Sequence, residues 1–111
     1  MLSEEKIMER VYETVLILRP DLSAEEGEGV VKKISQKIKD GGGEIFSCRL
    51  WLENRKFAYV LRSRGAERKK YDQGNYWLIE FKLAIEKLAE LKEVIRLEEN
   101  ILRSLIVRKS D

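Results

Sequence analysis

The alternation of apolar and polar side chains predicts a first strand over residues 11–18, because the run VYETVLIL is β-branched or aliphatic almost throughout. Arg19 and Pro20 end this run, since proline lacks a backbone donor and has a fixed φ. Both alternating sets of side chains are mostly apolar, which predicts a central place for the strand in a sheet.

A helix is predicted to follow. Ser23 and Glu26 have the spacing of a capping box, in which each side chain bonds to the backbone N–H of the other residue. The apolar positions that give the helix one buried face are Val30, Val31, Ile34 and Ile38. Gly27 and Gly29 each weaken its first turns by about 1 kcal/mol relative to alanine. The glycines at 41–43 supply left-handed conformations that end it.

A long hairpin is predicted next. Residues 44–61 carry many apolar and aromatic side chains without proline or glycine, which predicts one long strand, bulged at residues 53–56. Residues 62–73 are polar and basic and are expected to form a loop. A strand over residues 75–81 follows Gly74 and completes a hairpin with a long tip.

Five apolar residues at helical spacing predict a second helix. They are Ala84, Ile85, Leu88, Leu91 and Ile95. Lys82 and Leu83 offer no side-chain acceptor for a cap, so packing has to determine where this helix begins. The run Ile101–Arg108 is predicted as a fourth strand.

This order of elements, with right-handed crossovers, predicts an α+β fold of the ferredoxin-like split βαβ type. Such a fold has a four-stranded antiparallel sheet with two helices on one face. We expect residues 11–108 to form this single domain, between an N-terminal extension over residues 1–10 and a polar tail over residues 109–111.

Composition narrows the class of protein. Of the 111 residues, 43% are hydrophobic and 38% are charged, which is typical of a globular domain with one core. The chain has one cysteine, Cys48, and no histidine, which excludes a disulfide scaffold and a structural zinc site. No apolar run approaches the roughly 20 residues that span a bilayer, and no presequence is visible. We therefore expect a cytosolic protein with no membrane association.

Enzymatic chemistry is not expected. Without histidine, acid/base catalysis would need a perturbed carboxylate, lysine or cysteine. Cys48 lies in a predicted strand without an activating base, which favours a structural thiol over a nucleophile. The glycines at 41–43 follow a helix, whereas a phosphate cradle leads into one, so we interpret them as a C-cap. We expect no catalytic site, no metal, no cofactor and no small-molecule substrate.

Positive charge is concentrated in the predicted hairpin, although the net charge of the chain is only +2. Five basic residues surround one acid, Glu67, at the hairpin tip: Arg62, Arg64, Arg68, Lys69 and Lys70. Such a cluster can neutralise several phosphates of a nucleic acid and release their counterions. The alternative is a solvated loop of a highly charged protein, but Arg55 and Lys56 on the preceding strand favour the first interpretation.

Apolar side chains are also expected on the sheet face that no helix covers, because both alternating sets are apolar in the first and fourth strands. Such a patch indicates a protein partner, unless it is an ordinary scatter of surface aliphatics. Several aromatic residues can stack on bases or fill the core, and for each one the core is the favoured interpretation. They are Trp51, Tyr59, Tyr71, Tyr76 and Trp77.

Four stretches occur in a specific order. The opening YETVLILRPDL is followed by RKFAY at residues 55–59, by the pattern G-x-Y-x-L-x-x-F from Gly74 to Phe81, and by RLEENILRSLIVR at residues 96–108. Together they resemble the small-subunit ribosomal protein six family over residues 11–108.

The chain departs from that family's pattern at several positions of the second strand. The family usually has glycine and proline where this chain has Glu53 and Val60, and Phe57 and Leu61 replace the usual leucine and isoleucine. The bend that the family makes here is therefore expected to be absent or made differently.

The resemblance implies a structural constituent of the small ribosomal subunit that binds the central domain of small-subunit rRNA together with small-subunit ribosomal protein eighteen. RNA or partner contact is predicted for Arg55, Lys56, Arg62, Arg64, Arg68, Lys69, Lys70 and Arg103. Only Arg55, Lys56 and Arg103 lie in the matching stretches, so the tip residues rest on charge alone.

Two other functions fit the same fold. A ferredoxin-like regulatory module would dimerise through its uncovered sheet and bind a small molecule, and self-association without affinity for ribosomal RNA distinguishes it. A small phosphate hydrolase is disfavoured, because the chain has neither a recognisable phosphate loop nor a histidine.

Overall fold

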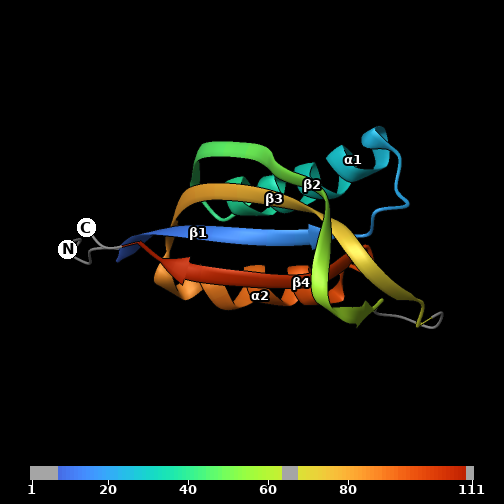
Figure 1. The fold of residues 1–111 in the computed structure, drawn as a ribbon. Helices are drawn as coiled ribbons and strands as arrows, with labels where there is room; N and C mark the ends of the chain where they lie inside the picture. Colours follow the sequence, from blue (N-terminus) through green and yellow to red (C-terminus); the bar gives the residue numbers. More distant parts are fainter. Residues whose placement is uncertain (1–7, 64–67, 110–111) are drawn as a thin grey trace, which may run out of the picture.

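The computed structural model describes residues 8–63 and 68–109. Four antiparallel strands form one sheet in the order β2-β3-β1-β4, and both helices pack on the same face of it (Figure 1). The strands are β1 Glu9–Leu18, β2 Glu44–Arg62, β3 Lys70–Ala84 and β4 Ile101–Arg108. The predicted ferredoxin-like α+β fold is confirmed, with β1 central between β3 and β4.

The first helix, α1 Ala24–Asp40, begins as predicted. The backbone N–H of Glu26 donates to Ser23 Oγ at 3.1 Å, and the backbone N–H of Ser23 donates to Glu26 Oε1 at 2.8 Å, which completes the capping box. All four predicted apolar positions of its inner face are buried. At its end, however, only Gly42 is left-handed, with φ +83°, so the prediction of left-handed glycines holds for one of three.

Gly29 is a helix-interior glycine whose conformational freedom can be removed without steric conflict. A Cβ at this position would meet no atom within 4 Å, and the residue is exposed. We expect Gly29→Ala to raise the free energy of unfolding by about 0.5–1 kcal/mol, because alanine has the higher helix propensity and restricts the unfolded chain. Thermal unfolding followed by circular dichroism measures this effect, and an unchanged or lower midpoint would contradict it.

The hairpin differs in length from its prediction. β2 extends to Arg62 and β3 already begins at Lys70, so residues 70–73 are strand rather than loop. The physical reason is that the long β2 supplies backbone partners far from the core, pairing Leu61 with Tyr71 and Arg62 with Lys70. Backbone pairing of this kind does not depend on side-chain hydrophobicity, and the apolar pattern therefore gave no signal for it.

The second helix begins later than predicted. Ala84 belongs to β3, where it pairs with Glu9, and Ile85–Lys87 form a 3₁₀ turn before α2 Leu88–Leu97. The backbone N–H of Ile85 donates to Met8 O at 2.8 Å, which holds this segment on the sheet. Leu91 and Ile95 are buried as predicted, and neither the turn nor α2 has a side-chain cap at its start.

The core lies between the helices and one face of the sheet. Its largest fully buried side chains include Phe81 on β3, Leu16 on β1, Ile34 on α1 and Leu91 on α2. The opposite sheet face carries no helix (Figure 1), and there Leu105 and Val107 of β4 are exposed to 61% and 42%. Within the part of the chain that the structure describes, no helix is long and apolar enough to cross a membrane.

Candidate nucleic-acid interface

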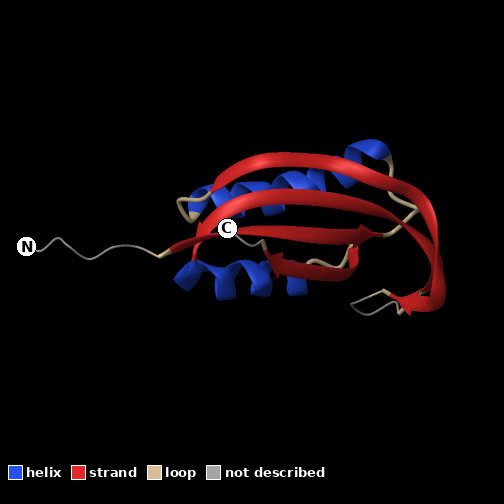
Figure 2. Ribbon diagram, turned by 60° about the vertical axis from the view of Figure 1, so that its left-hand side comes forward, coloured by secondary structure: helices blue, strands red, loops and turns tan. Residues whose placement is uncertain are grey.

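The outer part of the β2–β3 hairpin reaches beyond the end of the sheet and curls across it (Figures 1 and 2). The curl comes from extra residues on β2. Between the pairs Lys56–Gln73 and Leu61–Tyr71 the chain advances five residues along β2 and only two along β3. The surplus residues, 57–60, form a bulge that bends the strand, while Arg55 and Lys56 before them stay paired with β3.

The bend is made by residues other than the family's glycine. Asn54 is left-handed with φ 50°, and its backbone N–H donates to Asn75 Oδ1 on β3 at 2.7 Å. Asparagine adopts this conformation more readily than most residues, so the chain bends here although it has Glu53 at the family's glycine position. A register shift between Leu52 and Arg55 confirms the predicted bulge at residues 53–56, but the larger shift, between Lys56 and Leu61, lies beyond the predicted residues.

The curled hairpin borders an open hollow of about 410 Å³ on the sheet face without helices. Tyr76 lies at its centre, with the ring centroids of Trp51 and Phe57 each 6.3 Å from that of Tyr76. Tyr59 also lines the hollow and is 82% exposed. These four residues are called the aromatic floor below. Three predicted site residues, Arg55, Lys56 and Arg103, also line the hollow, together with aliphatic residues of β1 and β2.

A second group of predicted residues lies at the hairpin tip. Arg62, Arg68, Lys69 and Lys70 are exposed, and none of them forms an ion pair within residues 8–63 and 68–109. Ser63 closes the base of the tip, because its N–H donates to Lys69 O at 2.7 Å and its Oγ accepts from the Lys69 N–H at 2.9 Å. Arg64 and Glu67 lie outside the described residues.

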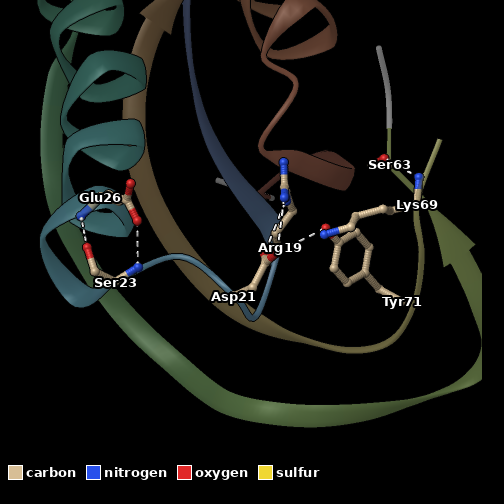
Figure 3. A network of polar contacts seen from close by, with 7 residues as sticks. All are labelled: Arg19, Asp21, Ser23, Glu26, Ser63, Lys69 and Tyr71. Carbon is tan, nitrogen blue, oxygen red and sulfur yellow. Dashed lines mark hydrogen bonds and ion pairs between the residues drawn. The ribbon is translucent and has the colours of Figure 1, made fainter. Parts of the chain in front are cut away.

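A polar network attaches the hairpin to the loop after β1 (Figure 3). Asp21 accepts two hydrogen bonds from the Arg19 guanidinium, at 3.1 and 3.0 Å, and one from the Tyr71 hydroxyl at 3.2 Å. The guanidinium carbon of Arg19 lies 5.4 Å from the centroid of the Tyr71 ring, within cation–π range. The hydrogen bonds and charge of Arg19 lower the pKa of Asp21. The sequence analysis did not find this network.

The lowered pKa of Asp21 has a defined consequence for stability. Its ionised form is favoured in the folded state, so its contribution is present above the unfolded-state pKa and is lost as the pH falls through the folded-state pKa. We expect Asp21→Asn to reduce the free energy of unfolding at pH 7 by about 0.5–1 kcal/mol, since the carboxylate is partly exposed. The stabilities of variant and wild type should converge in acid, which unfolding curves between pH 7 and pH 2 measure. A difference that is independent of pH would exclude this charge as the cause.

The aromatic residues correct one prediction. The core was the favoured interpretation for five of them, but Tyr59 is 82% and Trp51 is 46% exposed, and none of the five is fully buried. Trp77 is the one that packs against the helix-side core. The apolar periodicity failed here because the bulge shifts the register of β2, so alternation along the sequence no longer indicates the face of the sheet.

Cys48 lies in β2 as predicted. Burial raises the pKa of its thiol, which disfavours the reactive thiolate, and Ser35 Oγ lies 4.0 Å from its sulfur. Among the residues that the structure describes, no group of three His, Cys, Asp or Glu side chains is placed to hold a metal ion.

A family model and similar proteins of known identity indicate the same family for this chain. A family model described as "Ribosomal protein S6" matches residues 11–108. The small ribosomal subunit protein bS6 of Moorella thermoacetica is 38% identical over 99 residues, which cover 89% of this chain and 93% of that protein. The bS6 protein of Caldanaerobacter subterraneus is 35% identical over 102 residues, covering 92% and 99%.

A solved structure agrees with this. The crystal structure of 30S ribosomal protein S6 from Thermotoga maritima superposes with a TM-score of 0.76 at 31% identity, covering 91% of this chain and 88% of that one. The family is one of ribosomal structural proteins and not of enzymes, as the sequence analysis expected. The chain therefore belongs to the ribosomal protein S6 family of the small ribosomal subunit.

Proposed function

We propose that this protein is a structural constituent of the cytoplasmic small ribosomal subunit that binds small-subunit rRNA together with small-subunit ribosomal protein eighteen. The observation that supports it most strongly is the basic hairpin of a nearly neutral chain. Seven of the eight predicted basic residues lie among the described residues, all on the hairpin or beside its hollow, and none forms an ion pair there. Cations without carboxylate partners are available for phosphates.

The tip residues suit contact with the RNA backbone. Four of them are exposed and lie at the outer end of the hairpin, away from the helices and the core, where they can approach a duplex (Figure 1). Contacts of this kind position a protein on RNA and do not read base sequence. On the helix side of the sheet α1 carries four carboxylates and four lysines, so its charges balance, whereas the charged side chains described at the tip (residues 62, 63 and 68–70) are all cations.

The uncovered sheet face suits the protein partner. On this face Val15 of β1 lies opposite Leu105 of β4, and Glu13 lies opposite Val107. The exposed side chains of β4 are apolar at both of these positions. β4 is also an edge strand, paired only with β1, so its outer backbone groups are available to a partner strand. We assign protein eighteen to β4 and the adjoining part of β1.

A titration tests both parts of the proposal. The protein is added to a central-domain fragment of small-subunit rRNA, with and without protein eighteen, at two salt concentrations. Tight binding that requires the partner and weakens with salt is the expected result. Binding to neither RNA nor partner would contradict the proposal.

The same exposed apolar face also fits the alternative function, a regulatory module. A regulatory module would use Leu105 and Val107 to self-associate, with a small molecule as its ligand. Sedimentation velocity at increasing protein concentration distinguishes the two, because a homodimer without RNA affinity supports the module and a monomer that binds RNA supports the ribosomal role.

A further inference from the structure

We infer that the hollow beneath the hairpin binds one unpaired RNA base, stacked on the aromatic floor, with its flanking phosphates held by Arg55 and Arg103. This inference rests on the proposed function and adds a second, chemically different contact to the phosphate-binding tip. A base paired within a helix is stacked on its neighbours and cannot enter such a hollow. The ligand is therefore a nucleotide in a loop, bulge or strand end.

The aromatic floor is built for a flat ligand. Trp51 meets Tyr76 edge to face, with an interplanar angle of 80°, so the edge of one ring covers part of the face of the other. Tyr59 is 82% exposed and lines the same hollow, which leaves its ring available. An aromatic ring that is not needed for the core is an unusual exposed apolar surface, and stacking on a base is one of its established uses.

The cations of the hollow favour a nucleotide over an apolar peptide. Arg55, Lys56 and Arg103 line it, and no carboxylate lies among its lining residues. Arg103 donates from Nη1 to Leu102 O at 2.6 Å, which orients its guanidinium, and its other N–H donors have no hydrogen-bond partner among the described residues. An apolar partner segment would bury these charges without compensation, which is costly. Phosphates on either side of a stacked base would instead neutralise them.

Size and position are consistent with this ligand. The hollow of about 410 Å³ lies in the range of about 300–1,000 Å³ that small-molecule sites occupy. Its lining includes Ile17 of β1 and Arg103 of β4 but not Val15, Leu105 or Val107, so the hollow adjoins the surface assigned to the protein partner and includes none of its exposed apolar side chains. Both contacts can therefore be made at once.

The test compares two RNA probes with the same number of phosphates. One is a uridine heptamer and the other is a heptamer of abasic ribonucleotides, each labelled for fluorescence anisotropy at low salt. We expect the full chain to bind the uridine heptamer about 5- to 100-fold more tightly, the range that one stacked base provides. Equal affinities would show that binding depends on charge alone and would overturn the inference.

Variants locate the site. Tyr59→Ala should remove most of the difference between the two probes, whereas Tyr59→Phe should keep it because the ring remains. Phe46→Ala, which removes an exposed aromatic ring of β2 that does not line the hollow, is the matched control and should bind as the wild type does. In a Trp77→Phe background, Trp51 is the remaining tryptophan, and quenching of its emission by the uridine heptamer would support a base in the hollow.

Failure of this inference can be told apart from failure of the proposed function. If the rRNA fragment and protein eighteen bind but the two heptamers do not differ, the base site is wrong and the ribosomal role stands. If protein eighteen protects Trp51 from an added quencher and displaces the uridine heptamer, the hollow is part of the binding site for the protein partner. That result would overturn the inference.

Discussion

Reversing the charge of three tip residues, with Arg68, Lys69 and Lys70 each changed to glutamate, is expected to weaken binding to the rRNA fragment about 100-fold near 0.1 M salt. Each exposed charge within reach of a phosphate contributes roughly 1 kcal/mol, so three lost attractions alone amount to about 3 kcal/mol, and repulsion of the phosphates by the new glutamates adds to this loss. All three side chains are exposed, so the fold should be retained, which circular dichroism checks.

The salt dependence of the same variant is the sharper measurement. Each phosphate contact that is lost should reduce the slope of log K against log salt concentration by about 0.7–0.9. Loss of three contacts therefore predicts a slope that is shallower by roughly 2–3. Lower affinity with an unchanged slope would mean that the tip supports the fold or the partner and does not touch phosphates.

A matched control separates local contact from overall charge. Lys32 and Lys39 on α1 and Lys92 on α2 are exposed and form no ion pair within the described residues. Changing these three to glutamate lowers the net charge by the same amount, but on the helix side of the sheet. We expect at most a few-fold loss of affinity from this variant. A loss equal to that of the tip variant would contradict a localised RNA interface.

Local signals predicted most of the fold. The capping box at Ser23, the apolar face of α1 and the run Ile101–Arg108 each depend on neighbours close in sequence, and the structure confirms them. The start of α2 was predicted too early because Ala84 is held extended by its pairing with Glu9, a contact between residues far apart in the chain. Periodicity carries no information about such pairing, and the poor cap left the boundary open.

The sequence predicted the basic residues of the candidate site but not the bend of the hairpin that brings them together. Arg55, Lys56 and Arg103 were singled out from the matching stretches, and the structure brings all three to one hollow. The exposure of Tyr59 was missed because it depends on a bulge that adds residues to one strand only. A bulge of this kind is set by the register between two strands, which the alternation of a single strand does not reveal. The Arg19, Asp21 and Tyr71 network was missed for the same reason, since it joins residues 50 positions apart.

Gly74 lies on β3 opposite Arg55, beside the bulges that bend the hairpin. Replacing it with alanine is expected to lower the free energy of unfolding by about 2–3 kcal/mol. A Cβ there would lie 2.8 Å from Leu18 O, 2.8 Å from Phe57 Cζ and 3.0 Å from Ile17 Cγ2. The first of these atoms belongs to the backbone of the central strand and cannot move aside without breaking the ladder. Thermal unfolding should show a midpoint about 10 °C lower.

The same substitution should also damage the hollow, because the Cβ would lie 2.8 Å from Cζ of Phe57, a residue of the aromatic floor. Repeating Gly74→Ala in a Phe57→Ala background removes the conflict with the ring but leaves that with Leu18 O. The cost of the alanine should therefore become smaller without vanishing, a coupling that a double-mutant cycle measures. Gly29→Ala, which adds the same methyl group in open space, is the control and should stabilise. If Gly74→Ala were as stable as the wild type, the bend would not depend on this close approach, and the position of the aromatic floor would need another cause.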